Sequence, residues 1–339
     1  MVECQPTTYP EFSAIRATTG GIYHLKGVYQ LQEDKRVLIP VNRSYSLDID
    51  GARHNGLINI RHYRKDMLIH EQATVRDLKQ TSELLFDVYG KPLLFLRSGG
   101  EVWYSSEYEI NGVVSQDSRN IADRIKECLL KAGFSHSYRI GIFGSHQVGL
   151  NGVDSDVDLI CWIKWDFREE FVRLVRESLK NANYQSTKET GKDAEYAMRY
   201  SKRLGVSLLG GWYLADKRMR WTRTDGVSIS LQCLNSVLDQ RVHKLFFDGL
   251  NDLWNSQEVI LPCKVVSAEG SYNFPKTWKL DVNGRLIDAI SFSWTHQGMG
   301  DDKEQFGDYL VKCDLVRTRN GEYLYLKKDN HYILPKSLL

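Results

Sequence analysis

Two aspartates, Asp156 and Asp158, are separated by one apolar residue at the start of an apolar stretch, residues 155–163. The β-branched and aromatic residues of this stretch predict a strand. Because side chains alternate between the two faces of a strand, we expect both carboxylates on one face and Val157 on the other. Carboxylates this close repel each other, and a divalent cation removes that penalty. The pair therefore predicts a site for Mg²⁺ or Mn²⁺, with Asp156 and Asp158 as its ligands.

A Gly-Ser pair precedes these aspartates at the end of another apolar run. Residues 138–143 predict a strand, and the glycine-containing residues 144–154 predict a loop. Gly144 allows the backbone to approach a phosphate closely, and Ser145 offers a hydroxyl and an N–H to the same oxygens. The strand, the loop and the paired carboxylates together predict a site for a metal-bound nucleotide.

The spacing of these residues resembles a known family. Gly144, Ser145, Gly149 and residues 155–159 follow the pattern G-S-x-x-x-G-x-x-x-x-x-S-D-x-D-L. Over about residues 119–235, the chain resembles the nucleotidyltransferase superfamily of DNA polymerase β, particularly its minimal nucleotidyltransferases. The resemblance implies Mg²⁺-dependent transfer of a nucleoside monophosphate from a nucleoside triphosphate to a hydroxyl of an RNA end, a protein or a small molecule. It implies that Asp156 and Asp158 are catalytic and that Gly144, Ser145 and Ser155 bind the nucleotide.

The chain departs from the pattern of this family at a third carboxylate. Active members usually carry it on a later strand, on the same face as the first two, and it helps to deprotonate the attacking hydroxyl. The best strand here is 226–234, whose alternating face carries Ser228, Ser230 and Gln232, with Ser230 at the expected position. Asp225 directly precedes that strand but is out of register with the position expected for the third carboxylate. The alternative to an active transferase is therefore a catalytically degenerate, nucleotide- or nucleic-acid-binding regulatory protein on the same fold.

Basic residues gather between the aspartates and this third strand. Residues 192–223 hold eight Lys and Arg against three Asp and Glu, a local charge of +5. Trp221 lies among them, a combination suited to phosphate contact and base stacking. The alternative is a solvated helix face followed by a turn. The residues expected to contact the nucleotide or its acceptor are Lys202, Arg203, Arg218 and Arg220.

The order of apolar patterns along the chain predicts an α/β protein of three parts. A β-rich N-terminal domain is expected over 1–117, a nucleotidyltransferase-like mixed sheet with helices over 118–257, and a small β-barrel, such as an OB-fold, over 258–339. Helical spacing predicts helices in the central part at 118–133, 166–182, 193–204 and 236–255. In the first of these, the apolar stripe consists of Ile121, Ile125, Leu129 and Leu130.

Composition restricts the classes of function that remain. The 339 residues are 42% hydrophobic and 11% aromatic, as in ordinary folded proteins, and the net charge is only +2. An anion site must therefore be local, which leaves RNA as a partner only through a defined surface. The apolar runs are too short to span a membrane, no signal peptide is visible, and the six cysteines are scattered. These features predict a cytoplasmic protein with no membrane partner.

Overall fold

The chain divides into two units in the computed structural model. One unit contains Met1–Ser115 and Phe143–Gly152, and the other contains Gln116–Ile142 and Val153–Leu339. The expected helix over 236–255 and the alternative ligand Asp225 lie outside the described residues, apart from the first two residues of that helix. The structure describes residues 3–6, 12–16, 22–25, 29–33, 36–47, 57–59, 84–88, 91–97, 102–107, 109, 114–149, 151, 155–223, 226–237, 256–273, 275–319 and 321–339.

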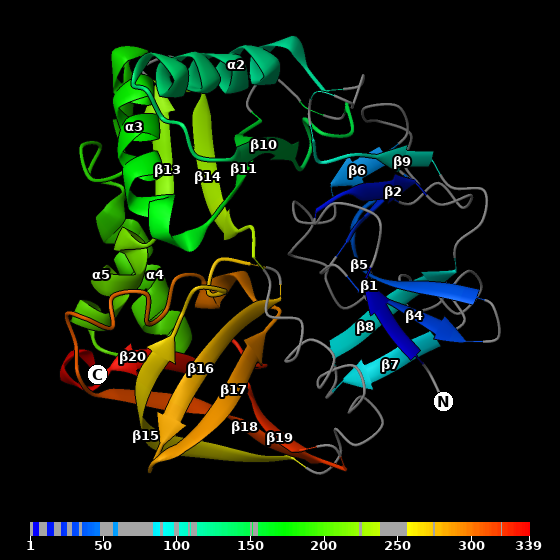
Figure 1. The fold of residues 1–339 in the computed structure, drawn as a ribbon, viewed down its shortest axis with the longest axis vertical. Coiled ribbons are helices and arrows are strands. Elements are labelled where there is room, and N and C mark those ends of the chain that lie inside the picture. Colours follow the sequence, from blue (N-terminus) through cyan, green and yellow to red (C-terminus); the bar gives the residue numbers. More distant parts are fainter. Residues whose placement is uncertain are drawn as a thin grey trace. The chain divides into compact units, whose positions relative to one another are not determined.

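The first unit is built on a nine-stranded sheet. Its main path is β1-β4-β5-β3-β2-β9, β6 and β8 also pair with β5, and β7 pairs with β8 (Figure 1). The strands are β1 (Glu3–Pro6), β2 (Ala14–Arg16), β3 (Ile22–Leu25), β4 (Tyr29–Glu33), β5 (Arg36–Leu47), β6 (Leu57–Asn59), β7 (Leu84–Val88), β8 (Lys91–Arg97) and β9 (Val102–Tyr104).

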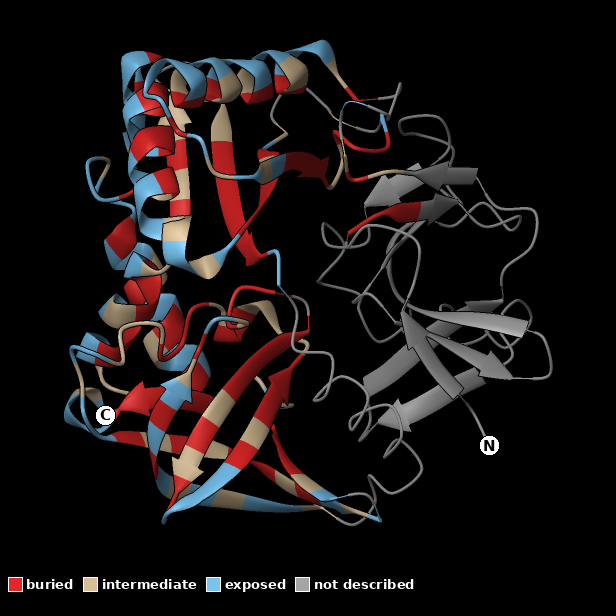
Figure 2. Cartoon of the chain, in the orientation of Figure 1, coloured by how far each residue is buried: buried red, intermediate tan, exposed pale blue. Residues whose placement is uncertain are grey.

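The second unit contains a five-stranded sheet with the order β10-β11-β14-β13-β12. Parallel pairing joins β11 to β14, and antiparallel pairing joins β14 to β13 and β13 to β12. Buried residues predominate along β11 and β14, as the central position of these strands requires (Figure 2). The strands are β10 (Tyr138–Phe143), β11 (Val157–Ile163), β12 (Tyr184–Ser186), β13 (Met219–Arg223) and β14 (Ser228–Asn235). The mixed α/β character expected for this part of the chain is confirmed.

Helices α2 (Gln116–Lys131) and α3 (Arg168–Asn181) belong to the same unit, and α3 follows the short 3₁₀ helix η3 (Trp165–Phe167). Both helices bury residues at helical spacing, such as Ile125 and Leu129 of α2. The expected stripe of α2 is wrong at Leu130, whose side chain is 78% exposed. Ile125 and Leu129 already fill the turn that faces the protein, so the next residue along the helix points to solvent.

A helix that the sequence analysis did not predict, α5 (Leu208–Asp216), packs against α4 (Asp193–Leu204). Gly210 and Gly211 weaken its helical pattern, but the Ser207 hydroxyl caps it by accepting the Gly210 N–H at 3.1 Å. A Cβ atom on Gly211 would lie 2.2 Å from the carbonyl oxygen of Ala197 in α4. Glycine is therefore required here because the two helices approach each other closely.

We expect Gly211→Ala to lower the free energy of unfolding by about 1–3 kcal/mol, the usual cost of overpacking. Alanine normally stabilises a helix interior by about 1 kcal/mol relative to glycine. A net loss of stability would therefore show that the close contact with Ala197 outweighs this gain. Urea unfolding measures the change. Gly307→Ala is the control, because a Cβ atom there meets no heavy atom within 4 Å. An unchanged or higher stability for Gly211→Ala would contradict the close approach of α4 and α5.

The C-terminal part of the second unit is a closed five-stranded barrel, as expected in outline. Its strands follow the order β15-β16-β17-β19-β18, and a pairing between β15 and β18 closes the ring. The pair β17 and β19 is parallel, and β20 adds to β18 outside the ring. The strands are β15 (Ser256–Ser267), β16 (Lys276–Val282), β17 (Arg285–Ser291), β18 (Tyr309–Thr318), β19 (Gly321–Tyr325) and β20 (Tyr332–Pro335), with the 3₁₀ helices η5 (Trp294–His296) and η6 (Lys336–Leu338).

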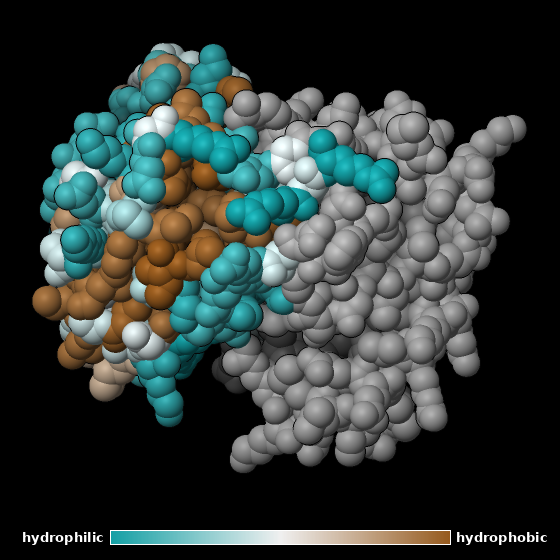
Figure 3. Space-filling model, turned by 90° about the horizontal axis from the view of Figure 1, so that it is seen from below, coloured by the Kyte–Doolittle hydropathy of each residue, from teal (hydrophilic) through white to brown (hydrophobic). Residues whose placement is uncertain are grey.

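Helices α4 and α5 lie between the five-stranded sheet and the barrel (Figure 1). Tyr200 and Leu204 of α4 and Leu214 of α5 belong to the same buried apolar cluster as the barrel residues Trp278 and Leu324. The two helices and the barrel therefore share one core. Apolar residues also reach the surface of the unit among polar ones (Figure 3).

A buried ionic cluster also joins the helices α3 and α5 to the barrel. Asp301 and Asp302, in the loop after η5, pair with Lys217 at the end of α5, and Lys217 Nζ lies 2.9 Å from Asp302 Oδ2. Asp301 also accepts a hydrogen bond of 2.6 Å from the Tyr272 hydroxyl and lies 3.9 Å from Arg168 of α3. The four charged side chains are only 7–18% exposed. Lys217, one of the eight basic residues noted above, is thus held by two barrel carboxylates.

Among the described residues, no helix is both long enough and apolar enough to cross a membrane.

Candidate functional site

Three polar residues form a row across three neighbouring strands of the five-stranded sheet. Asp158 of β11 lies directly opposite Ser230 of β14, and Ser230 lies opposite Arg220 of β13. Residues opposite each other in paired strands point to the same face. The Ser230 hydroxyl donates a hydrogen bond to Asp158 Oδ1, which places Ser230 beside the expected metal ligand.

Asp156 lies beside this row, two residues before Asp158 in the chain, and its side chain is 46% exposed to solvent. The expected strand over 155–163 begins two residues later than predicted, at Val157, so Asp156 precedes β11. Its Oδ2 atom is 4.0 Å from Nη1 of Arg220. Asp156 and Asp158 therefore both lie near the guanidinium of Arg220. Together these three side chains have a net charge of −1.

Helix α4 positions the guanidinium of Arg220. Nη1 of Arg220 donates a hydrogen bond of 3.0 Å to the hydroxyl of Tyr196, a residue of α4. Burial by itself lowers the pKa of Arg220, but Tyr196, Asp158 and Asp156 together outweigh that effect and raise its pKa above the usual value. Arg220 thus stays charged beside the two aspartates.

Two further arginines surround the ring of Tyr196. The Cζ atoms of Arg199 and Arg218 each lie 5.5 Å from the ring centroid, and that of Arg220 lies 5.8 Å from it. Arg218 also donates a hydrogen bond to the hydroxyl of Tyr200. The structure therefore brings Arg218 and Arg220, two of the four basic residues named from the sequence, to one aromatic ring.

The other two basic candidates have different surroundings. Lys202 is exposed on α4, and Arg203 forms an ion pair of 2.8 Å with Asp329, which lies between β19 and β20. The contact of Arg203 with Asp329 joins α4 to the barrel.

The Gly-Ser turn directly follows β10. Gly144 has a φ angle of +75°, in the left-handed region that glycine adopts readily, and Ser145 is half-buried. Both belong to the first unit, whereas Ser155, Asp156 and Asp158 belong to the second. A joint role for the turn and the carboxylates stays a prediction.

Gln232 is a further polar residue on the face of β14 that carries Ser230. Its side chain is 8% exposed, and its Oε1 has no hydrogen-bond partner among the described residues. Since buried polar atoms in folded proteins are nearly always hydrogen-bonded, Gln232 is a candidate contact for a ligand. The alternating pattern of 226–234 placed Gln232 on this face but did not indicate that its oxygen is unpaired.

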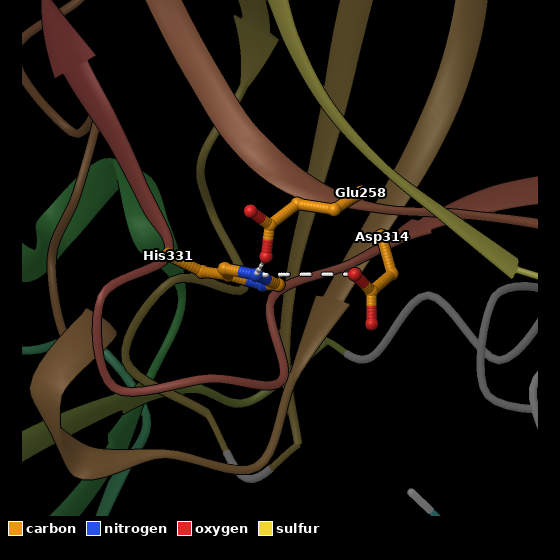
Figure 4. A group of neighbouring side chains, drawn as sticks. All are labelled: Glu258, Asp314 and His331. Atoms are coloured by element: carbon orange, nitrogen blue, oxygen red, sulfur yellow. Dashed lines mark hydrogen bonds and ion pairs between the residues drawn. The ribbon is translucent and has the colours of Figure 1, made fainter.

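A second polar cluster was not predicted from the sequence. Glu258 of β15, Asp314 of β18 and His331, just before β20, offer ligand atoms that all lie within 4.8 Å of one another (Figure 4). The three residues are far apart in the chain and follow no short motif. Only the pairing of β15 with β18 brings Glu258 opposite Asp314.

Comparison of the chain with protein-family models, with curated proteins and with solved structures gives no match. Any assignment of function therefore rests on the motif and on the geometry of these two sites.

Proposed function

We propose that this chain binds a nucleoside triphosphate together with Mg²⁺ on the face of β11, β14 and β13. The observation that carries the proposal is the row Asp158–Ser230–Arg220, with Asp156 beside it. It adds to the resemblance of residues 144–159 to nucleotidyltransferases, from which the roles of Gly144, Ser145 and Ser155 follow.

The residues of the row fit Mg²⁺. Two carboxylates and a serine hydroxyl are hard oxygen ligands, and Mg²⁺ in proteins commonly uses one or two carboxylates while phosphate oxygens complete its shell. The excess negative charge of Asp156 and Asp158 over Arg220 favours a cation. When bound, Mg²⁺ would link these carboxylates to the triphosphate. Arg220 and Arg218 can then donate hydrogen bonds to phosphate oxygens.

The row supports nucleotide binding better than it supports chemistry. Ser230 occupies the position at which the resemblance implies a third carboxylate, and a neutral serine hydroxyl is a poor base for a proton from the acceptor. Binding of the triphosphate needs Asp156, Asp158 and the arginines but no such base. We therefore propose a nucleotide-binding, regulatory role on a nucleotidyltransferase-type fold.

Transfer of a nucleoside monophosphate to a hydroxyl is the second candidate function. It is favoured by the 46% exposure of Asp156, which leaves a carboxylate accessible beside the row. A metal ion there could lower the pKa of an acceptor hydroxyl without a third carboxylate.

The barrel resembles an OB-fold, a five-stranded Greek-key barrel that often binds oligonucleotides on its second and third strands. In β16 and β17, which are those strands here, Lys279 lies opposite Asp288, and Asp281 lies opposite Leu286. Arg285 is held by Glu322 at 2.7 Å. This surface has neither the surplus of basic residues nor the aromatic side chains that RNA binding uses. It therefore does not favour RNA over a protein or a small molecule as the acceptor.

Nucleotide binding is tested by titrating the full chain with each nucleoside triphosphate, with and without Mg²⁺, by calorimetry. We expect Mg²⁺-dependent binding that weakens by about tenfold or more in Asp158→Asn, because a charged ligand of the ion is lost. Asp166→Asn, an exposed aspartate of η3, is the matched control and should bind as the unmodified chain does. Equal affinity in Asp158→Asn and the unmodified chain, or no binding of any nucleotide, would contradict the proposal.

Pyrophosphate release and label transfer in the same samples distinguish the two candidates. Binding without turnover favours the regulatory role. Turnover that is lost in Asp158→Asn and kept in Asp166→Asn shows a transferase instead.

A further inference from the structure

The cluster of Glu258, Asp314 and His331 is located where the barrel closes. Glu258 and Asp314 are opposite each other in the antiparallel pair β15 and β18, and His331 comes from the connection between β19 and β20 (Figure 4). His331 is fully buried and Asp314 is 5% exposed, whereas the Glu258 side chain is 40% exposed. Two of the three side chains are therefore held in place by burial, and the third, Glu258, is accessible to solvent.

The distances in the cluster suit a small metal ion. Nε2 of His331 lies 3.2 Å from Oε2 of Glu258 and 3.9 Å from Oδ1 of Asp314. A tetrahedral Zn²⁺ ion bound at about 2.0–2.2 Å holds its ligand atoms about 3.4 Å apart. All three ligand atoms lie within 4.8 Å of one another, so the side chains would draw together around the ion.

The other ring nitrogen of His331 lies beside one backbone donor and one backbone acceptor. Nδ1 accepts the backbone N–H of Lys327 at 3.1 Å, and the carbonyl oxygen of Tyr325 is 3.3 Å away. Without an ion, the proton lies on Nε2 and is donated to Glu258. With an ion on Nε2, the proton would lie on Nδ1 and be donated to the Tyr325 carbonyl, as is typical of histidine ligands, and the Lys327 N–H would give up its bond to Nδ1.

Two lysines balance the charge of the carboxylates. Lys328 pairs with Glu258, and Lys327 Nζ lies 3.9 Å from Asp314 Oδ2, on the side away from His331. Lys328 shares Oε2 of Glu258 with His331, so it competes with an ion for that oxygen. Its side chain is 46% exposed and can turn into solvent.

We propose that Glu258, Asp314 and His331 bind a divalent transition-metal ion of the Zn²⁺ type. An imidazole with two carboxylates suits such ions, whereas Mg²⁺ prefers oxygen ligands alone. The ion would tie the closing strands β15 and β18 to the connection before β20, and it would leave one coordination position for water. This site is separate from Asp156 and Asp158 and does not depend on the proposed nucleotide site.

The test is a titration of the full chain with Zn²⁺, and separately with Mg²⁺, followed by calorimetry and thermal melts. We expect one Zn²⁺ bound by this cluster per chain and a higher melting temperature with Zn²⁺. Glu258→Gln should weaken binding by about tenfold or more, since it removes a ligand. Lys328→Gln should tighten binding, because it removes the competing ammonium group. Glu322→Gln, which removes a carboxylate of another ion pair of the barrel, should leave Zn²⁺ binding unchanged.

The opposite effects of two exposed substitutions separate a metal site from an ordinary ion-pair cluster. In an ion-pair cluster, Glu258→Gln and Lys328→Gln would both change stability slightly, and neither would change Zn²⁺ binding. That result, or Zn²⁺ binding that is the same in Glu258→Gln and the unmodified chain, would overturn the proposal. Asp156→Asn/Asp158→Asn should keep this Zn²⁺ site, so a failure of the nucleotide proposal is recognised independently.

Discussion

Asp301→Ala is expected to lower the free energy of unfolding by about 3–5 kcal/mol, the usual effect of removing one partner from a buried ion pair. The carboxylate of Asp301 pairs with Lys217, lies 3.9 Å from Arg168 and accepts the Tyr272 hydroxyl at 2.6 Å. Without it, a guanidinium that is only 14% exposed loses a neighbouring opposite charge, and the buried Tyr272 hydroxyl loses its acceptor. Lys217 keeps Asp302 as a partner, so the loss arises mainly at Arg168 and Tyr272.

The measurement is unfolding in guanidinium chloride, followed by circular dichroism. Asp308→Ala is the control, because the Asp308 side chain is exposed and, within the described part of the chain, only its backbone carbonyl accepts a hydrogen bond, from Lys336. A loss of less than about 1 kcal/mol for Asp301→Ala, the value typical of surface ion pairs, would show that the cluster does not hold α3, α5 and the barrel together.

Ser230→Asp is expected to tighten Mg²⁺ binding by about tenfold or more, because it adds a third carboxylate directly opposite Asp158. Ser230 is only 9% exposed, so the new carboxylate would be buried beside another one. Without Mg²⁺ we expect a loss of stability of about 1–3 kcal/mol, moderated by Arg220 on the neighbouring strand. Mg²⁺ should restore that stability.

Thermal melts and calorimetry with and without Mg²⁺ measure both effects. Ser230→Asn is the matched control, since it has nearly the same size as aspartate but carries no charge, and its stability should not respond to Mg²⁺. If Ser230→Asp is destabilised and Mg²⁺ gives no recovery, the row Asp158–Ser230–Arg220 is not a metal site. Pyrophosphate release gained in Ser230→Asp would indicate that nucleotidyl transfer by this chain lacks only the third carboxylate.

Local patterns in the sequence were sufficient to predict several elements. Helical spacing placed α4 over 193–204, and runs of β-branched and aromatic residues placed β10 at 138–143 and β11 to within two residues. The alternation of 226–234 placed Ser230 on the face that meets Asp158. These predictions succeed because periodicities of 3.6 and 2 residues are properties of short segments, and each segment buries one face.

The tertiary structure decided which of these residues meet. Arg220 lies near Asp156 and Asp158 because β13 pairs with β14, and Lys217, from the same basic segment, is held instead by Asp301 and Asp302 of the barrel. Composition of the segment cannot separate these two outcomes, since both residues are basic and close in the chain.

The cluster in the barrel depends on long-range pairing in the same way. Glu258, Asp314 and His331 come together because β15 closes the ring against β18 and the connection after β19 covers that pair. Strand register is set by contacts between segments far apart in the chain, and no local pattern records it. The sequence by itself therefore determined the paired aspartates and the strands that carry them, while the neighbours of each charge were determined by how the strands pair.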